Sequence, residues 1–255
     1  MWLCLILNTC LNQEMTMKLS KLFLAITLAT SSVYANDELW EGTKARHFGD
    51  RVITQVDDVT FLDVQAPERA YTATHVPITL VADSSKYRVI YLFVDNNPVQ
   101  HVATFNLTDH IEMLRLHTRI RVETNSNIRL IGETHDGKLH MDYDYTKASG
   151  GCSAYVDFTS EILYKDIGRI RTKQKDGLFT THIKHPQFTG LQKDLDRGGT
   201  IPRYLVESVT WTNENGDIVL SATTDMSISM NPFFNLEYDK PLSVSVIDTK
   251  GDLYE

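Results

Sequence analysis

Alternation of apolar and polar residues constrains the fold of this chain more than any other feature of its sequence. One run alternates as Leu114-Arg115-Leu116-His117 and continues as Arg119-Ile120-Arg121-Val122. A second run places Leu139, Met141, Tyr143 and Tyr145 around His140, Asp142 and Asp144, and a third places serines between Leu242, Val244 and Val246. Successive strand residues point to opposite faces, so each run predicts a strand with one buried and one exposed face.

Reversal signals separate these runs. They are Asp95-Asn96-Asn97-Pro98, Asp136-Gly137, Asn215-Gly216-Asp217 and Lys250-Gly251. Short strands joined by such turns are typical of antiparallel sandwiches. No stretch of twelve or more residues after Asn36 has the apolar period of an amphipathic helix. A glycine-containing connection over residues 146–165 divides the strands into two sets, which predicts an all-β chain with two antiparallel β-sandwich domains in tandem.

The N-terminus has the pattern of an export signal that starts at Met17. Lys18 and Lys21 form a basic region, an apolar stretch follows, and Val33-Tyr34-Ala35 fits a cleavage site, so the mature chain is predicted to begin at Asn36. The first 16 residues lack a basic region before their own apolar run, which indicates an upstream extension of the true start. No later segment approaches the ~20 apolar residues that span a bilayer. The sequence therefore predicts a periplasmic protein without a membrane span.

Net charge and residue clusters narrow the range of possible partners and active sites. The chain has 33 Asp and Glu against 25 Lys and Arg, and this acidic excess disfavours nucleic acids and anionic membranes as partners. The remaining candidate sites have structural interpretations. His182 and His185 flank a strand end on opposite faces, Met226 and Met230 are core residues of a strand, and Asp142 and Asp144 form a solvated strand face. No catalytic residue, metal site or cofactor is predicted.

One thiol remains as the candidate functional group. Export would remove Cys4 and Cys10 and leave Cys152, in the run Ser149-Gly150-Gly151-Cys152, without a disulfide partner in an oxidising compartment. Such a cysteine is either an inert core residue or a thiol that meets a group from outside the chain. The two glycines favour a flexible, accessible segment, and a thiolate needs access to react. Nearby Lys147 would lower the pKa of the thiol.

Several motifs then resemble one family, in the correct order along the chain. The first half is similar to SoxY, the sulfur-carrier subunit of the bacterial Sox system, at Tyr91–Pro98, His101–Phe105, Thr118–Arg121, Asp136-Gly137 and Gly150-Gly151-Cys152. The second half is similar to SoxZ, its partner subunit, at His185-Pro186, Thr189-Gly190-Leu191, Ile201-Pro202-Arg203 and Asn231-Pro232. Together they resemble the fused SoxYZ-like carriers that occur alongside quinoprotein dehydrogenases.

This resemblance implies a fold and a function. Each half would be an immunoglobulin-like sandwich. Cys152 would be the covalent carrier of a sulfur-containing intermediate on an arm with Gly150 and Gly151. The partners would be periplasmic oxidoreductases, either Sox-type enzymes or a quinoprotein dehydrogenase system. The implied segments are a leader and extension (1–35), an N-terminal segment (36–58), a SoxY-like domain (59–152), a linker (153–165) and a SoxZ-like domain (166–255).

One departure from the family and three alternatives remain. The SoxY arm ends its chain, whereas Ser153 and a whole second domain follow Cys152 here, so the arm forms a loop. A scaffold for a periplasmic dehydrogenase would not need the thiol. A single-cysteine redox protein would use it as a nucleophile, although no resolving cysteine accompanies it. The two halves could pair within one chain or between copies in a homo-oligomer.

Overall fold

A computed structural model describes residues 34–56, 58, 60–155 and 161–255. The predicted export signal lies almost entirely outside the described residues. The chain divides into two compact units, residues 1–49 and 50–255.

The described part of the first unit is a helix, α2 (Tyr34–Phe48). The sequence predicts no amphipathic helix after residue 36, and α2 is a helix without an amphipathic pattern. The segment lacks an apolar stripe, so periodicity could not reveal it, but it is free of proline and rich in good helix formers. Arg46 and His47 lie in its last turn, where positive charge is favourable, and Gly49 follows with a φ of +60°.

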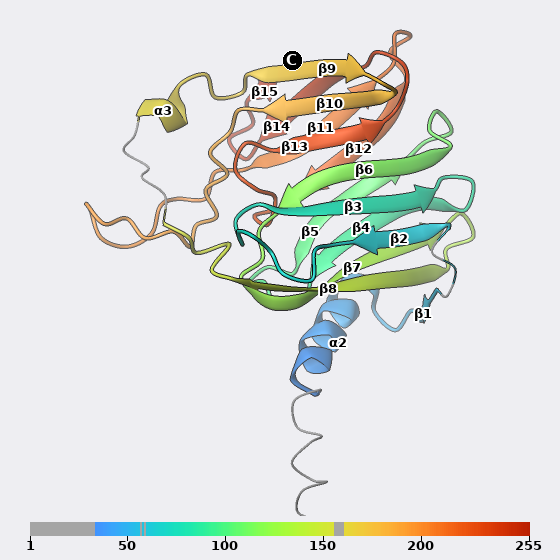
Figure 1. Ribbon diagram of the computed structural model, residues 1–255, viewed down its shortest axis with the longest axis horizontal. Coiled ribbons are helices and arrows are strands. Elements are labelled where there is room, and N and C mark those ends of the chain that lie inside the picture. Colours follow the sequence, from blue (N-terminus) through green and yellow to red (C-terminus); the bar gives the residue numbers. More distant parts are fainter. Residues whose placement is uncertain (1–33, 57, 59, 156–160) are drawn as a thin grey trace, which may run out of the picture. The chain divides into compact units, whose positions relative to one another are not determined.

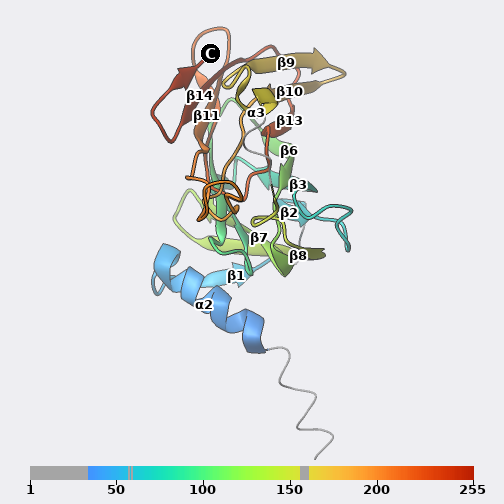
Figure 2. The same cartoon turned by 90° about the vertical axis from the view of Figure 1, so that its left-hand side faces the viewer.

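Strands of the second unit form two sheets that lie face to face (Figures 1 and 2). Among the described residues, the nine-stranded sheet has the spatial order β1 (Ile53–Gln55), β8 (Leu139–Ser149), β7 (Thr124–Thr134), β4 (Tyr87–Val94), β5 (His101–Leu107), β12 (Ile218–Thr224), β11 (Val206–Thr212), β14 (Ser243–Asp248) and β15 (Leu253–Tyr254). The six-stranded sheet has the order β2 (Leu62–Gln65), β3 (Val76–Asp83), β6 (Met113–Ile120), β13 (Phe233–Glu237), β10 (Leu178–Ile183) and β9 (Ile170–Lys175). A short helix, α3 (Glu161–Tyr164), lies in the connection between the halves.

Each half of the chain contributes strands to both sheets. Strands β1 to β8 form one antiparallel immunoglobulin-like sandwich, apart from a parallel β1–β8 pair, and β9 to β15 form the other. The two sandwiches join edge to edge within the chain, because β5 pairs with β12 in the large sheet and β6 pairs with β13 in the small one. We call these two strand pairs the seam. The all-β, two-sandwich prediction is confirmed.

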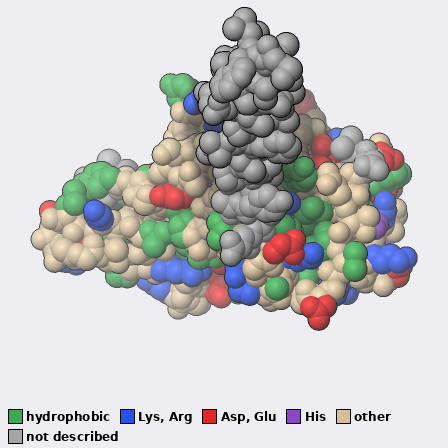
Figure 3. All heavy atoms as spheres, turned by 90° about the horizontal axis from the view of Figure 1, so that it is seen from below, with side chains coloured by type: hydrophobic (Ala, Val, Ile, Leu, Met, Phe, Trp, Pro, Cys, Tyr) green, Lys and Arg blue, Asp and Glu red, His purple; other side chains and the backbone are tan. Residues whose placement is uncertain are grey.

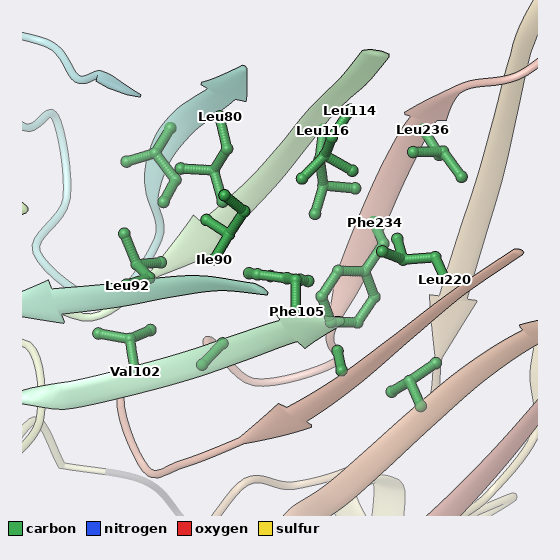
Figure 4. Packing of buried hydrophobic residues seen from close by; sticks show 14 of the residues in the cluster. Leu80, Ile90, Leu92, Val102, Phe105, Leu114, Leu116, Leu220, Phe234 and Leu236 are labelled. Carbon is green, nitrogen blue, oxygen red and sulfur yellow. The ribbon is translucent and has the colours of Figure 1, made fainter. Parts of the chain in front are cut away.

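One hydrophobic core fills the space between the sheets and continues across the seam. Figure 4 shows buried side chains from both halves in contact, including Leu116 and Phe105 from the first half and Phe234 and Leu220 from the second. Trp211 packs edge-to-face on Phe234, with ring centroids 5.3 Å apart. Buried aromatic rings contribute large apolar areas to a core. The core therefore holds the two sandwiches together as well as each sandwich by itself.

Most turns and strand faces agree with the sequence patterns. All four predicted reversals join neighbouring strands, and Leu242, Val244 and Val246 are buried as expected. The second run of alternation was misread. Tyr143 and Tyr145 are exposed, at 42% and 37% of their surface, whereas Asp142 and Asp144 are half-buried.

The two aspartates satisfy the backbone of a neighbouring strand. Asp142 Oδ2 accepts a hydrogen bond from the backbone N–H of Val64 at 2.9 Å, and Asp144 Oδ2 accepts one from Ala66 at 2.8 Å. The first amide lies on β2 and the second directly follows its end; β2 is an edge strand whose free donors would otherwise offer a template for another strand. Asp142 and Asp144, predicted to form a solvated strand face, thus cover the free edge of β2.

One face of the molecule carries side chains of both charges. Figure 3 shows acidic and basic side chains scattered among hydrophobic ones on the face drawn there. Within the described part of the chain, no helix has both the length and the apolar character needed to cross a bilayer.

Candidate functional site around Cys152

Cys152 follows directly on the end of β8, after two glycines with different roles. Gly150 has a φ of +76°, a conformation that favours glycine, and a Cβ there would meet no atom within 4 Å. Gly151 is packed tightly: a Cβ built on it would lie 2.3 Å from the carbonyl oxygen of Ala73 and 2.5 Å from that of Val122. The backbone therefore approaches its neighbours here as only glycine permits.

The thiol is buried, contrary to the sequence expectation of an accessible segment. Cys152 has 0% exposure and packs with Leu205 and Met226, and half-buried Val99 covers the same cluster. Leu205 and Met226 belong to the second half of the chain. The glycines here allow close packing rather than mobility, which explains why the expectation failed.

Glu123 holds the backbone of this segment. Its Oε2 accepts hydrogen bonds from the backbone N–H of Cys152 (2.7 Å) and of Ser153 (3.1 Å), and its Oε1 accepts one from Ser153 Oγ (2.5 Å). The N–H of Gly150 and that of Gly151 also donate to the carbonyls of Glu123 and Val122. Hydrogen bonds to a carboxylate are stronger than neutral ones, so Glu123 clamps the segment onto the end of β6 and the start of β7.

The second half of the chain holds the same segment from the other side. Thr189 Oγ1 lies 3.0 Å from the carbonyl oxygen of Cys152 and 2.8 Å from Gln192 Oε1, and it can donate to one of them at a time. Gln192 Oε1 also accepts the backbone N–H of Thr189. Residues from both sandwiches thus close the site.

Arg121 is a buried neighbour of Cys152 and is 3% exposed. The alternation of its strand had predicted a position on the solvent-exposed face. The strand ends at Ile120, so the pattern no longer fixes the direction of the next side chain. Arg121 Nη1 donates to the carbonyls of Gln187 (2.8 Å), Met226 (3.1 Å) and Ile228 (3.3 Å). A buried guanidinium bound to neutral carbonyls leaves a positive charge beside the thiol.

Asn97 ties these groups together. Its amide nitrogen donates to the carbonyl of Arg121 (2.9 Å) and to Ser227 Oγ (2.8 Å), and its Oδ1 accepts the backbone N–H of Glu123 (2.8 Å). The turn that the sequence showed as a reversal signal therefore also orders the neighbours of Cys152.

This environment disfavours the thiolate. Burial raises the pKa of Cys152 to about 11, and the Glu123 carboxylate adds to the increase. Arg121 and a hydrogen bond with Ser227 act in the opposite direction but do not compensate. Lys147, expected to lower the pKa of the thiol, instead pairs with Glu68 at 2.8 Å. In the closed arrangement the sulfur is a protonated, shielded thiol.

Comparison with known protein families matches both halves. Residues 44–152 match the model of sulfur oxidation protein SoxY, and residues 170–255 match that of sulphur oxidation protein SoxZ. The chain is a fusion of a SoxY domain and a SoxZ domain. The SoxY match ends on Cys152 itself. The chain thus belongs to the SoxY and SoxZ family of sulfur-oxidation carriers.

Solved structures give weaker similarities. The sulfur carrier protein SoxY from Chlorobium limicola f thiosulfatophilum is 22% identical, with a TM-score of 0.36, and the match covers 44% of this chain and 98% of that one. A superoxide reductase (neelaredoxin) from Ignicoccus hospitalis is 12% identical, with a TM-score of 0.29, and the match covers 38% of this chain and 94% of that one. A search of curated proteins gave no match.

Motifs of the SoxY and SoxZ domains meet at Cys152. Asn97, Arg121 and Thr189 all belong to segments that carried the family resemblance, and the structure brings them to one place. Sequence reasoning missed their role, and it missed Glu123 altogether, because a lone glutamate after a strand carries no local signal. Met226 also lies in a loop after β12 rather than on a strand, and there it covers the thiol.

The two histidines do not meet. His182 lies on an exposed face of β10, whereas His185 is fully buried. Burial lowers the pKa of His185 to about 4, although Asp248 lies 3.8 Å from its Nε2. At neutral pH the imidazole is therefore neutral and no ion pair forms. Tyr254 donates to Asp248 at 2.8 Å, and the Tyr204 ring packs on His185.

Proposed function

We propose that this chain is a periplasmic, non-catalytic carrier that holds a sulfur-containing intermediate on Cys152 and presents it to partner oxidoreductases. The observation that carries the proposal is the SoxY match, which ends on this cysteine. In the same proposal, residues 59–152 form the carrier domain and residues 166–255 the SoxZ domain, with 153–165 as the linker. Sox-type enzymes or a quinoprotein dehydrogenase system would be the partners.

Loading requires the buried segment to open. Glycine at position 150 has access to more backbone conformations than other residues, and release of Glu123 and Thr189 would free the backbone of Cys152. Outside the site, the sulfur would lose the burial that raises its pKa and regain ordinary thiolate reactivity. Both ends of the segment stay attached to sandwiches, so the moving part is a loop whose apex carries the thiol.

The loading step is a thiol–disulfide type of exchange. The Cys152 thiolate attacks one sulfur of a sulfur–sulfur bond in the donor, and a new S–S bond forms on Cys152. The donor bond breaks, and its second sulfur leaves as an anion that takes up the proton lost by Cys152. Electrons balance within the exchange, so no external oxidant is needed.

A second candidate function follows from the burial of the thiol. A protein whose cysteine stays closed would act as a scaffold for a periplasmic dehydrogenase, and Cys152 would then be a core residue. The raised pKa and the 0% exposure of Cys152 favour this alternative.

Intact mass separates the two functions. A carrier purified from its own cells without reductant is expected to show an added mass that dithiothreitol removes and that Cys152→Ser abolishes. Ser149→Ala, at an exposed serine just before the two glycines, is the matched control and keeps the adduct. An unmodified thiol during active sulfur oxidation, with full pathway activity in Cys152→Ser, would reject the carrier and leave the scaffold.

A further inference from the structure

Basic side chains gather on the outer face of the six-stranded sheet. This sheet lies in front in Figure 1, so the outer face is turned to the viewer. Alternation sends every second residue outward, and on β6, β13, β10 and β9 the outward positions carry five Lys or Arg, two His and a single acidic residue, Glu237. We call the basic members of this set the basic sheet face: Arg115, His117, Arg119, Arg171, Lys173, Lys175 and His182.

Strand register aligns these side chains into rows. In the first row His182 is paired with Phe233 on one side and with Arg171 on the other, and Arg119 lies 4.7 Å from the centre of the Phe233 ring. In the second row Thr180 is paired with Lys173 and with Asn235, which is paired with His117. These rows cross the seam, because β6 of the first half contributes Arg115, His117 and Arg119, whereas β9 and β10 of the second half contribute the other basic members.

Few of these charges are neutralised. Glu237 pairs with Arg115 at 3.6 Å, and Asp176 lies 3.4 Å from Lys175. Among the described residues, no ion pair within 4 Å involves Arg119, Arg171 or Lys173. The nearby positive charges of Arg119 and Arg171 assist burial in lowering the pKa of His182. On a chain with a net charge of −8, this face is a local reversal of sign.

The surface has relief suited to side chains of a partner. Two hollows lie at this surface, and half-buried Phe233 lines one of them with Arg119. One hollow, of about 330 Å³, is lined by Arg169, Arg171, His182 and Lys184 together with Asp166, Ile183 and Asn231. The other hollow, of about 420 Å³, is lined by Phe233 and Arg119 and also includes His117 and Thr79. Arginine and aromatic residues are enriched where proteins bind one another.

We propose that the basic sheet face docks the acidic surface of a partner protein, with an acidic side chain of the partner in the hollow at Arg171 and His182. An acidic partner is proposed because its negative charge would complement the positive charge of this face. A protein partner covers a limited area, whereas an extended anionic surface such as a membrane would also face the acidic remainder of the chain and be repelled.

The test uses the full chain and a fluorescein-labelled poly-glutamate peptide as a defined acidic probe. We expect saturable binding at low salt that weakens toward physiological ionic strength, as screening predicts. Arg171→Glu with Lys173→Glu should weaken binding about tenfold or more, because each reversal turns an attraction into a repulsion. Neutral Arg171→Gln with Lys173→Gln should give an intermediate loss and guards against misfolding of the reversed variant.

The matched control reverses the same amount of charge elsewhere. Lys193 and Arg197 are exposed loop residues, and Lys193→Glu with Arg197→Glu should change the affinity less than twofold. Equal losses in both double variants would show that only net charge matters and would overturn the proposal. Absence of binding to the unmodified chain would overturn it as well. Tighter binding to phosphatidylglycerol vesicles than to the peptide would reject a protein partner in favour of a membrane.

Discussion

Removal of the Glu123 carboxylate should open the cysteine site. Glu123→Ala eliminates the three hydrogen bonds to Cys152 and Ser153, two of them donated by the backbone and one by the Ser153 hydroxyl. Each bond to a charged acceptor contributes about 1.5–3 kcal/mol, and Ser153 is exposed, so its donors regain water on opening. The free energy of opening should therefore fall by about 3 kcal/mol in total, which increases the open population about 150-fold.

The assay is the rate of thiol labelling by iodoacetamide at constant pH under native conditions. When opening and closing are fast, the rate is proportional to the open population. Glu123→Ala should therefore be labelled about two orders of magnitude faster than the unmodified chain. Glu123→Gln keeps one acceptor oxygen, replaces the other with a donor NH2 group and loses the charge, so its labelling rate should fall between the two. Glu112→Ala, an exposed glutamate in the same domain, is the control.

Two results would refute this reasoning. An unchanged labelling rate in Glu123→Ala would mean that the carboxylate does not hold the segment. A rate in the unmodified chain that rises with urea as steeply as global unfolding would mean that the thiol is reached only through the unfolded state. Local opening exposes little surface and therefore gives a shallow urea dependence.

Three further predictions follow from the described contacts. Gly151→Ala places a Cβ 2.3 Å from the carbonyl oxygen of Ala73, so the segment must shift. We expect faster labelling of Cys152 by iodoacetamide and a lower urea midpoint of unfolding. An unchanged labelling rate would contradict the tight packing of Gly151. Because the pKa of His185 is about 4 when folded and ~6.5 in an unfolded chain, its contribution to stability is complete above pH ~6.5 and is lost as the pH falls toward 4. Urea titrations of His185→Gln should show a flatter pH dependence over that range, whereas a parallel curve would exclude the imidazole as the cause. Asp142→Ala with Asp144→Ala leaves the amides of Val64 and Ala66 without their acceptors and should reduce the free energy of unfolding by about 2–4 kcal/mol. The exposed edge should also cause self-association that gel filtration detects. The control is Asp63→Ala, which removes another acidic residue of the same edge region.

The fold could be predicted from the sequence where local rules decide it. Alternation in β6 and β14 and the turn residues at Asp136-Gly137 and Lys250-Gly251 gave correct strands, because side-chain direction and positive φ are local properties. The same rules failed for Tyr143 and Asp142, since β8 turns its acidic side toward the edge of β2 and only the tertiary arrangement determines that. Helix α2 was missed because it lacks an apolar stripe.

The site could be located but not described from the sequence. A lone cysteine after two glycines pointed to Cys152, and the family resemblance agreed. Its burial could not be foreseen, since the residues that cover or clamp it, such as Met226, Glu123 and Thr189, are separated from it by 29 to 74 positions in the chain. Contacts over such separations depend on how the two domains join.

The seam has a consequence for how this protein responds to dilution. In separate SoxY and SoxZ subunits, pairing of β5 with β12 and of β6 with β13 would be a bimolecular event that low concentration reverses. Here one polypeptide carries both partners, so each domain meets the other at a fixed effective concentration set by the linker. Thr189 of the second domain contacts Cys152 of the first across the seam. The reactivity of the thiol should therefore report whether the two domains are paired, at any protein concentration.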